Sequence, residues 1–321
     1  MGCKNFGDYH DLYLKTDVLL LADIFQNFRC SAISKYKLDP ANYLTAPSMA
    51  WDAMLEMTKI KLGLIHNDET RVLFESNKRG GIVQAGGTRH AFANNKYMKN
   101  YDETKESSFI SYLDMNNQYG CAMIDYLPTE LNGFCDKTLQ EIINHKADAD
   151  IGYFVECDIE IPVELHEKFK QLPLCPISRG VNFDELSTYQ QSLLKIDNNT
   201  TKHNEKTKKL ILDFHKKEKY LVHYRYLQFV VKMGYIVTKI HRCVEFKQSQ
   251  WLKPYIDSNT NYRKEKGISP FLKDFYKLMN NSIYGKTNEN ILGRNNLDLI
   301  KDDKFAIKKM SKENFKTASI Q

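Results

Sequence analysis

The stretch from Phe109 to Pro128, FISYLDMNNQYGCAMIDYLP, constrains the fold of this chain more than any other part of the sequence. Its first residues, Phe109 to Leu113, are mostly aromatic and apolar and predict a strand. Asp114 follows where this strand would end, and the apolar run after Gly120 predicts the start of a helix. Many α/β enzymes place a metal-binding carboxylate at the end of a strand. Aspartate is also a common turn residue, and position alone favours that ordinary role.

The residues after Asp114 favour the metal site. The order Asp-x-Asn-x-x-Tyr, from Asp114 to Tyr119, resembles the first palm motif of family B DNA polymerases. It is most similar to the protein-primed branch, which includes enzymes of viruses, linear plasmids and Polinton (Maverick) transposons. Gly120 stands where that branch usually has proline, and a glycine there has only to permit the turn.

A second motif lies on a helix predicted to begin at Ser269-Pro270, because proline suits the first helical turn. At 3.6 residues per turn, the sequence FLKDFYKLMNNSIYGK divides into a broad apolar face and a polar face. The polar face comprises Lys273, Lys277, Asn280, Asn281 and Tyr284. A solvated surface is the ordinary explanation for the two lysines, although an anion between them would offset their repulsion.

The line Lys277-x-x-x-Asn281-Ser-x-Tyr284-Gly285 resembles the second polymerase motif of the same branch. The resemblance implies that Lys277 binds the triphosphate of the incoming nucleotide. It also implies that Asn281 and Tyr284 line the nucleotide pocket and that Gly285 allows close packing. Because Lys273 lies one turn earlier on the same face, we expect it to contact phosphate too.

The resemblance further implies two-metal chemistry. Asp114 and the backbone carbonyl of Met115 would hold the Mg²⁺ ions that align a primer 3′-oxygen with the α-phosphate. Tyr119 would pack under the deoxyribose and exclude ribonucleotides, and Asn117 would contact DNA. The third palm motif, Asp-Thr-Asp on a strand turn, is not apparent, because the pair Asp302-Asp303 lies in a polar run typical of a surface.

A glycine-rich stretch, KRGGIVQAGGTRH, runs from Lys78 to His90 and contains two Gly pairs between basic residues. Gly pairs let backbone N–H groups approach a phosphate, although a plain Gly-rich hairpin explains the pattern equally well. Lys78-Arg79-Gly80-Gly81 resembles the Tyr-x-Gly-Gly element of these polymerases, which touches DNA. Lys78 replaces the tyrosine, so we expect phosphate contacts there rather than base stacking.

The N-terminal region predicts one long amphipathic helix from Tyr9 to about Tyr36. Asp17 falls within its apolar stripe, one turn after Tyr13, and a salt bridge or a metal would explain a buried carboxylate equally well. The Tyr13-x-x-x-Asp17 spacing resembles the third motif of a 3′–5′ exonuclease domain, in which Asp17 would bind metal and Tyr13 would position water. Only one of the three exonuclease motifs is apparent, so we expect no proofreading from the chain as given.

Four further elements are predicted. Tyr153 to Ile161 alternates as a strand and Tyr235 to Phe246 predicts another, whereas Tyr220 to Val231 predicts a packed helix. The polar, Lys-rich residues 197–220 indicate an exposed loop and helix. The first strand carries three acids on one face, for which we expect solvent exposure: Glu156, Asp158 and Glu160.

The resemblance implies an α+β fold, a partial family B polymerase incomplete at both ends. Its parts would be the end of an RNase H-like exonuclease, an antiparallel-sheet palm and helical fingers. The predicted segments are 1–70 (exonuclease remnant and connector), 71–134 (palm entry with the Gly-rich loop and first motif), 135–232 (insertion contacting the priming protein), 233–290 (palm strand and fingers) and 291–321 (truncated downstream segment).

Composition agrees with a DNA partner without requiring one. The chain has 321 residues and a net charge of +6, which suits an acidic partner such as nucleic acid. No apolar run is long enough for a membrane span, and the N-terminus lacks the apolar core of a signal peptide. Seven cysteines without a C-x-x-C pattern indicate free thiols in a reducing compartment. We therefore expect an intracellular, nuclear, viral or mobile-element location.

Three hypotheses of function follow. The first is a DNA-directed DNA polymerase that transfers dNMP to a primer 3′ end, with primer–template DNA, dNTP and a terminal protein primer as partners; we expect the isolated chain to be inactive. The second is a catalytically dead relic that only binds DNA or nucleotide. The third is an unrelated α+β nuclease, which is disfavoured because it does not explain the Lys277 to Gly285 spacing.

Overall fold

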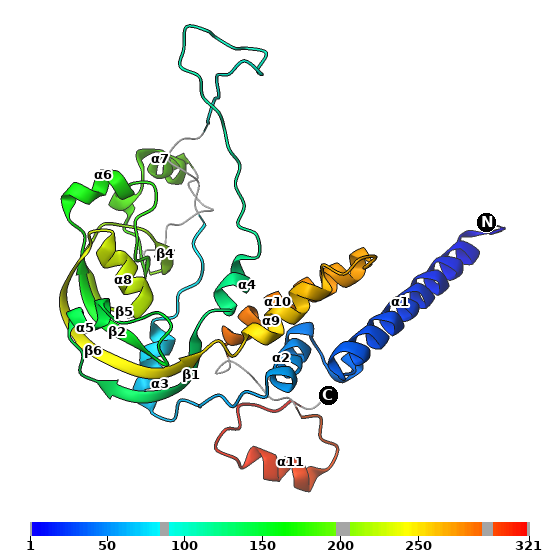
Figure 1. The fold of residues 1–321 in the computed structure, drawn as a ribbon. Coiled ribbons are helices and arrows are strands. Elements are labelled where there is room, and N and C mark those ends of the chain that lie inside the picture. The colour runs from blue at the N-terminus through cyan, green and yellow to red at the C-terminus, as the bar shows by residue number, and fades with distance from the viewer. Residues whose placement is uncertain (1, 84–89, 197–205, 291–297, 320–321) are drawn as a thin grey trace.

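The computed structural model describes residues 2–83, 90–196, 206–290 and 298–319, and the fold is mixed α+β (Figure 1). The helices are α1 (Phe6–Tyr36), α2 (Ala46–Thr58), α3 (Asp68–Ser76), α4 (Gln118–Met123), α5 (Leu139–Ile143), α6 (His166–Phe169), α7 (Thr188–Ile196), α8 (Tyr224–Lys232), α9 (Lys253–Tyr262), α10 (Pro270–Thr287) and α11 (Asp303–Met310). The strands are β1 (Leu127–Cys135), β2 (Ile151–Glu160), β3 (Ile177–Arg179), β4 (Lys209–Ile211), β5 (Lys217–His223) and β6 (Ile236–Ser249).

The larger sheet is antiparallel throughout, with strand order β1-β6-β2-β5. It curves around α8, which packs on one face (Figure 1). Inward side chains such as Val155, Cys157 and Ile159 of β2 meet Leu227 and Val230 of α8 in one apolar core. Alternate residues of a strand point to the same face, so the period-2 pattern of β2 builds this core directly.

A second core joins the helices beside the sheet. It contains buried residues of α2, α9 and α10 and the C-terminal end of α1. A chain of buried polar groups runs through it, because the Tyr36 hydroxyl donates to Asn259 at 2.7 Å and the Asn259 amide donates to Asn280 at 2.8 Å. The sequence prediction placed Asn280 on the polar face of its helix, and that prediction is wrong, since Asn280 is 1% exposed. Its side chain is satisfied by Asn259 instead of by water.

The connections between sheet and helices bring distant segments together. α4 leads directly into β1, and β6 leads directly into α9. Leu127 pairs with Ser249 at this end of the sheet, and the Gln250 side chain donates to the carbonyl of Ile124 at 3.1 Å. An ion pair between Asp125 and Arg225 of α8 also anchors the segment after α4. The end of α4 and the start of α9 therefore lie side by side.

The long N-terminal helix is confirmed, but its apolar stripe is not buried. α1 projects away from the rest of the chain (Figure 1), and its buried residues, Ala32 and Tyr36, lie near its C-terminal end. Leu14 and Leu21, two apolar residues of this stripe, are more than half exposed. Asp17 is exposed too, so its carboxylate needs neither a salt bridge nor a metal to offset burial.

Two other predictions of elements fail. Residues 109–113 are exposed and extended but form no strand, and the only bridge nearby joins Asn94 to Ser108 among the described residues. In place of a helix, the region before Tyr220 contains β4 and the start of β5, while residues 197–205 lie outside the described residues. The predicted helix from Tyr220 is α8 and begins at Tyr224; the strands at 153–161 and 235–246 are confirmed as β2 and β6.

The three acids of β2 are each paired with a basic residue, and of the three only Glu156 is buried against the expected solvent exposure. Glu156 is buried and accepts two hydrogen bonds from Arg242 of β6. Asp158 contacts His241 at 2.7 Å, and Glu160 pairs with Lys216 at 2.8 Å. Cross-strand pairs of opposite charge stabilise a sheet, and this explains three acids on one face without a metal.

The large sheet takes its strands from three of the predicted segments. β1 comes from segment 71–134, except for its last residue, Cys135, which lies in the next segment. β2 and β5 come from 135–232, and β6 comes from 233–290. The boundaries themselves remain predictions. Among the described residues, no helix combines the length and apolar character that crossing a bilayer requires.

Replacing Asn280 with alanine is expected to lower the free energy of unfolding by about 1–3 kcal/mol, because the buried amide of Asn259 would lose its acceptor. The same change at the neighbouring Asn281, which is exposed, is the matched control and should cost less than about 0.5 kcal/mol. Urea unfolding followed by circular dichroism measures both. Equal losses in the two variants would contradict the burial of Asn280.

His223 gives the stability of the chain a dependence on pH. Its ring packs against Phe154 and Phe246, and its Nδ1 accepts a hydrogen bond from the Arg225 backbone at the start of α8. Burial, and then the Arg225 cation, lower the pKa of His223 to about 4. An unfolded histidine has a pKa of about 6.5, so the unfolded chain binds this proton more readily.

The contribution of His223 to stability is therefore complete above about pH 6.5 and is lost as the pH falls toward 4. We expect a loss of about 3 kcal/mol over that interval. In His223→Asn, which keeps an N-cap acceptor but cannot titrate, the slope of unfolding free energy against pH should flatten. His66→Gln, at an exposed position, should leave the slope unchanged; an unchanged slope in His223→Asn would refute the assignment.

Candidate active site

The rotation of α10 determines which side chains it presents. Ser269 caps the helix by accepting from the Leu272 backbone, and Pro270 occupies its first turn. One face is buried in the second core, through Phe275, Tyr276, Met279, Asn280, Ser282 and Ile283. The opposite face is exposed and carries the predicted nucleotide-binding residues Lys273, Lys277, Asn281, Tyr284 and Gly285. A Cβ at Gly285 would meet nothing within 4 Å, so close packing against this glycine does not occur within the described chain.

α4 carries the end of the first motif. It is a short helix whose N-cap, Asn117, has a left-handed backbone with φ of 55°, a conformation that asparagine tolerates better than most residues. Gly120 is buried, and a Cβ there would lie 2.2 Å from the Asn117 side-chain nitrogen. Gly120 therefore does more than permit the turn, because it leaves the space in which the Asn117 amide lies.

The two motifs meet at a pair of tyrosines. The rings of Tyr119 on α4 and Tyr284 on α10 have centroids 4.5 Å apart and planes inclined at 39°. Both rings remain partly exposed, at 49% and 39%. Residues 165 positions apart in the sequence thus form one surface. A ligand lying on this surface would touch both motifs at once.

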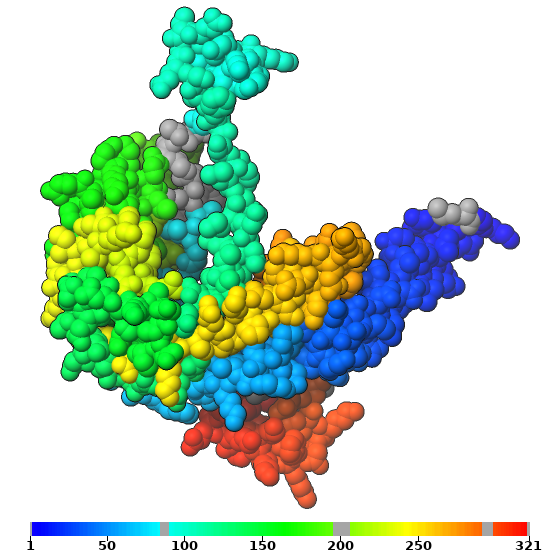
Figure 2. Space-filling view, viewed as in Figure 1, coloured from blue at the N-terminus to red at the C-terminus, as the bar shows by residue number. Residues whose placement is uncertain are grey.

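Asp114 and Met115 lie in the exposed segment just before α4. In Figure 2 this segment stands upright beside the α9–α10 pair. Among the described residues, no group of three or more His, Cys, Asp or Glu side chains could hold a metal ion. One carboxylate and one carbonyl are nevertheless the oxygen donors that Mg²⁺ prefers, since it commonly takes one or two carboxylates and completes its shell with substrate phosphates.

The glycine-rich segment is tied to the sheet through Arg79. Both terminal nitrogens of its guanidinium donate to the carbonyl of Leu221 at 2.9 Å, and the group lies 3.7 Å from the centre of the Tyr220 ring. Burial lowers the pKa of Arg79. These contacts give Arg79 a structural role, and its predicted contact with DNA remains a prediction.

The residues beside Arg79 are more open. Lys78 is exposed and pairs with Glu75 at 2.9 Å, while a Cβ at Gly80 or Gly81 would meet nothing within 4 Å. Backbone N–H groups in such open glycines can be approached closely by a ligand. The second Gly pair of this stretch, at 86–87, lies outside the described residues.

The predicted exonuclease residues are not brought to this surface. Tyr13 and Asp17 lie on the exposed part of α1, which points away from α4 (Figure 1). Tyr13 stacks on Tyr9 with ring centroids 6.4 Å apart. Their predicted roles in metal and water binding therefore stay predictions.

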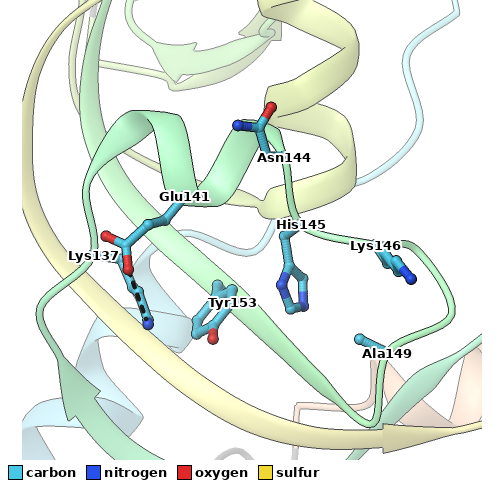
Figure 3. Close-up of a pocket in the computed structure, with 7 residues that line it drawn as sticks. All are labelled: Lys137, Glu141, Asn144, His145, Lys146, Ala149 and Tyr153. Carbon is cyan, nitrogen blue, oxygen red and sulfur yellow. Dashed lines mark hydrogen bonds and ion pairs between the residues drawn. The ribbon is translucent and has the colours of Figure 1, made fainter.

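A pocket that the sequence gave no reason to expect lies beside α5 (Figure 3). It has a volume of about 380 Å³ and is lined by Lys137, Glu141, Asn144, His145, Lys146, Ala149 and Tyr153. Its charged and aromatic groups are engaged with one another: Lys137 pairs with Glu141 at 3.3 Å, and His145 Nε2 contacts the Ile151 carbonyl at 2.7 Å. This engagement explains the pocket as part of the packing of α5 on the sheet.

A double-mutant cycle on Tyr119→Ala and Tyr284→Ala tests the contact between the motifs. Their coupling in unfolding free energy should be about 0.5–1.5 kcal/mol, the usual value for an aromatic pair. A control cycle that pairs Tyr119→Ala with Tyr97→Ala, at an exposed position in the loop before α4, should give a coupling near zero. Equal coupling in both cycles would mean that Tyr119 and Tyr284 do not touch.

Comparison with known proteins places these observations in a family. The sequence model of DNA polymerase type B, organellar and viral, matches residues 8–320. No curated protein matches the chain. Among solved structures, Phi29 DNA polymerase in its post-translocation binary complex with primer-template DNA is similar over 89% of this chain, at 16% identity and a TM-score of 0.49. Its orthorhombic crystal form is similar over 77% of this chain, at 16% identity and a TM-score of 0.45.

The chain spans about two fifths of the length of these Phi29 structures, 41% and 37%. The match to the family model covers nearly the whole chain, including both motifs that meet at Tyr119 and Tyr284. This chain therefore belongs to the type B DNA polymerase family of organelles and viruses.

Proposed function

We propose that this chain carries the nucleotide-binding surface of a protein-primed, DNA-directed DNA polymerase, which transfers dNMP to a primer 3′ end. The observation that carries the proposal is the contact of Tyr119 with Tyr284. It joins the segment that bears Asp114 to the exposed face of α10 that bears Lys277. Membership of the polymerase family supports the same assignment.

The order of residues along α10 sets the orientation of the nucleotide. Lys273 and Lys277 lie in the N-terminal half of the helix, one turn or about 6 Å apart along its axis. Tyr284 lies about 10 Å further along, against Tyr119. A triphosphate would therefore lie over the lysines, toward the N-terminal end of the helix. The sugar and base would lie toward Asn281 and the two tyrosines.

The chemistry assigned to the other residues follows from this orientation. Tyr119, with its ring held by Tyr284, would pack under the deoxyribose and leave no room for a 2′-hydroxyl. Asp114 and the carbonyl of Met115 would hold Mg²⁺ near the phosphates. Bound Mg²⁺ supplies Lewis-acid stabilisation of the charge that develops during phosphoryl transfer.

Primer–template DNA would be held through its phosphates. Lys78, Arg79 and the open backbone of Gly80 and Gly81 are the proposed contacts, together with Asn117 at the start of α4. Such contacts are independent of sequence and weaken as salt rises. We also propose that residues 135–232 face a terminal protein primer, that Tyr13 and Asp17 derive from an exonuclease site, and that the chain serves a viral or other mobile element.

A second candidate function is binding of DNA or nucleotide without catalysis. It is favoured by the metal-binding groups, because the described residues contain no cluster of three or more His, Cys, Asp or Glu side chains that could hold a metal ion. Two-metal catalysis ordinarily needs more than one such ligand. The two candidates differ in primer extension and agree in nucleotide binding, so both measurements are needed.

Lys277→Ala is expected to weaken Mg²⁺–dATP binding about 10- to 100-fold, the usual cost of one charge-assisted contact. Titration calorimetry on the whole chain measures this, and Lys308→Ala, an exposed lysine on α11, is the control that should bind as the parent does. Extension of a labelled primer that disappears in Asp114→Ala would establish the polymerase. Binding without extension in the parent chain would support the second candidate for the chain as given, and equal binding by the Lys277 and Lys308 variants would refute both.

A further inference from the structure

Two cysteines face each other across the edge of the large sheet. β1 is an edge strand and β6 is its neighbour. In their antiparallel register Cys135 lies directly opposite Cys243, as the last pair at that end of the ladder. Directly opposite residues of antiparallel strands carry their side chains on the same face of the sheet, so the two thiols lie on one face. The placement follows from the strand register and has no connection with the proposed nucleotide surface.

The spacing of such a pair suits a covalent bond. Directly opposite residues on antiparallel strands have Cα atoms about 4.5 or 5.5 Å apart, depending on the type of pair. Disulfides span Cα separations of about 4.4–6.8 Å. Cys135 and Cys243 therefore need only small side-chain adjustments to bond, with no movement of the strands.

The two thiols differ in access to solvent. Cys135 is partly exposed, whereas Cys243 is 2% exposed and packs in the core of the sheet. Burial raises the pKa of both thiols, which slows their reaction at neutral pH because the thiolate is the nucleophile. A reagent from solvent can reach Cys135 first, and Cys243 is then the only thiol placed to attack it from within the sheet, among the described residues.

We propose that Cys135 and Cys243 form a thiol pair that a small-molecule disulfide, such as oxidised glutathione, converts to a cross-strand disulfide. Cys135 attacks one sulfur of the oxidant, forms a mixed disulfide and releases one glutathione thiol. Cys243 then attacks the Cys135 sulfur, forms the protein disulfide and releases the second glutathione thiol. Two protein thiols lose two electrons and two protons, and the oxidant gains both.

The bond would secure one of the two edge strands of the sheet. β1 pairs on one side only, and its register shifts between Leu131 and Gly133. Cys135 is the last residue of the strand, beyond that irregularity, where an edge strand frays most easily. A covalent link to β6 would hold this end in register and would slow hydrogen exchange of the β1 amides.

The test is oxidation of the whole folded chain with excess oxidised glutathione, followed by alkylation and peptide mass spectrometry without reduction. We expect a peptide pair joined through Cys135 and Cys243, lighter by two hydrogens, at least ten times more abundant than any link between Cys157 and Cys175. Those two thiols are wholly buried and do not face each other in the ladder. The exposed Cys30 reports that the oxidant is active.

The variant Cys243→Ser separates the two steps, because its mixed disulfide at Cys135 cannot be resolved. It should accumulate one glutathione at Cys135, while the parent chain should not. A parent chain that keeps glutathione on Cys135 beside an alkylated Cys243 would overturn the proposal. Alkylation of both Cys135 and Cys243 in a sample whose Cys30 is fully glutathionylated would also overturn it. Both of these results come from the parent chain and need no variant.

Discussion

The rotation of α10 about its own axis is the constraint on which the candidate site depends. Apolar residues alone leave a helix some freedom to turn, because an apolar face is broad. Asn280 removes that freedom, since its amide has a partner in the core only when it faces Asn259. Lys277, Asn281 and Tyr284 must then face outward. A polar residue inside the core thus determines what the opposite face offers to a ligand.

The second requirement is that α10 be placed beside the first motif, and the sheet provides this. The pairing of Leu127 with Ser249 holds the exit from α4 next to the entry to α9. From there α9 packs against α10 in the second core, and the Tyr284 ring meets Tyr119. The long-range part of the site is therefore a consequence of strand register, which fixes the positions of both connections.

The parts of this arrangement that could be predicted are those with a local cause. Period and capping gave α10 with its exposed lysines, and strict alternation gave β2 and β6. The strand predicted at 109–113 does not form, because a strand needs a hydrogen-bonding neighbour and none is available in the described chain. Three polar side chains also have surroundings that the sequence did not predict, those of Asn280, Arg79 and Asp17. Residues far away in the sequence decide whether a polar side chain is buried, hydrogen-bonded to a backbone carbonyl or exposed to solvent.

The central claim is that Asp114 and Lys277 bind opposite ends of the same nucleotide complex. The most direct measurement is a crystal structure of the chain with primer–template DNA, a non-hydrolysable dNTP and Mg²⁺. The account predicts phosphate oxygens within hydrogen-bonding distance of the Lys277 amine, a metal ion between those phosphates and the Asp114 carboxylate, and the sugar on Tyr119. A nucleotide bound elsewhere, or one that contacts only one of the two motifs, would contradict it.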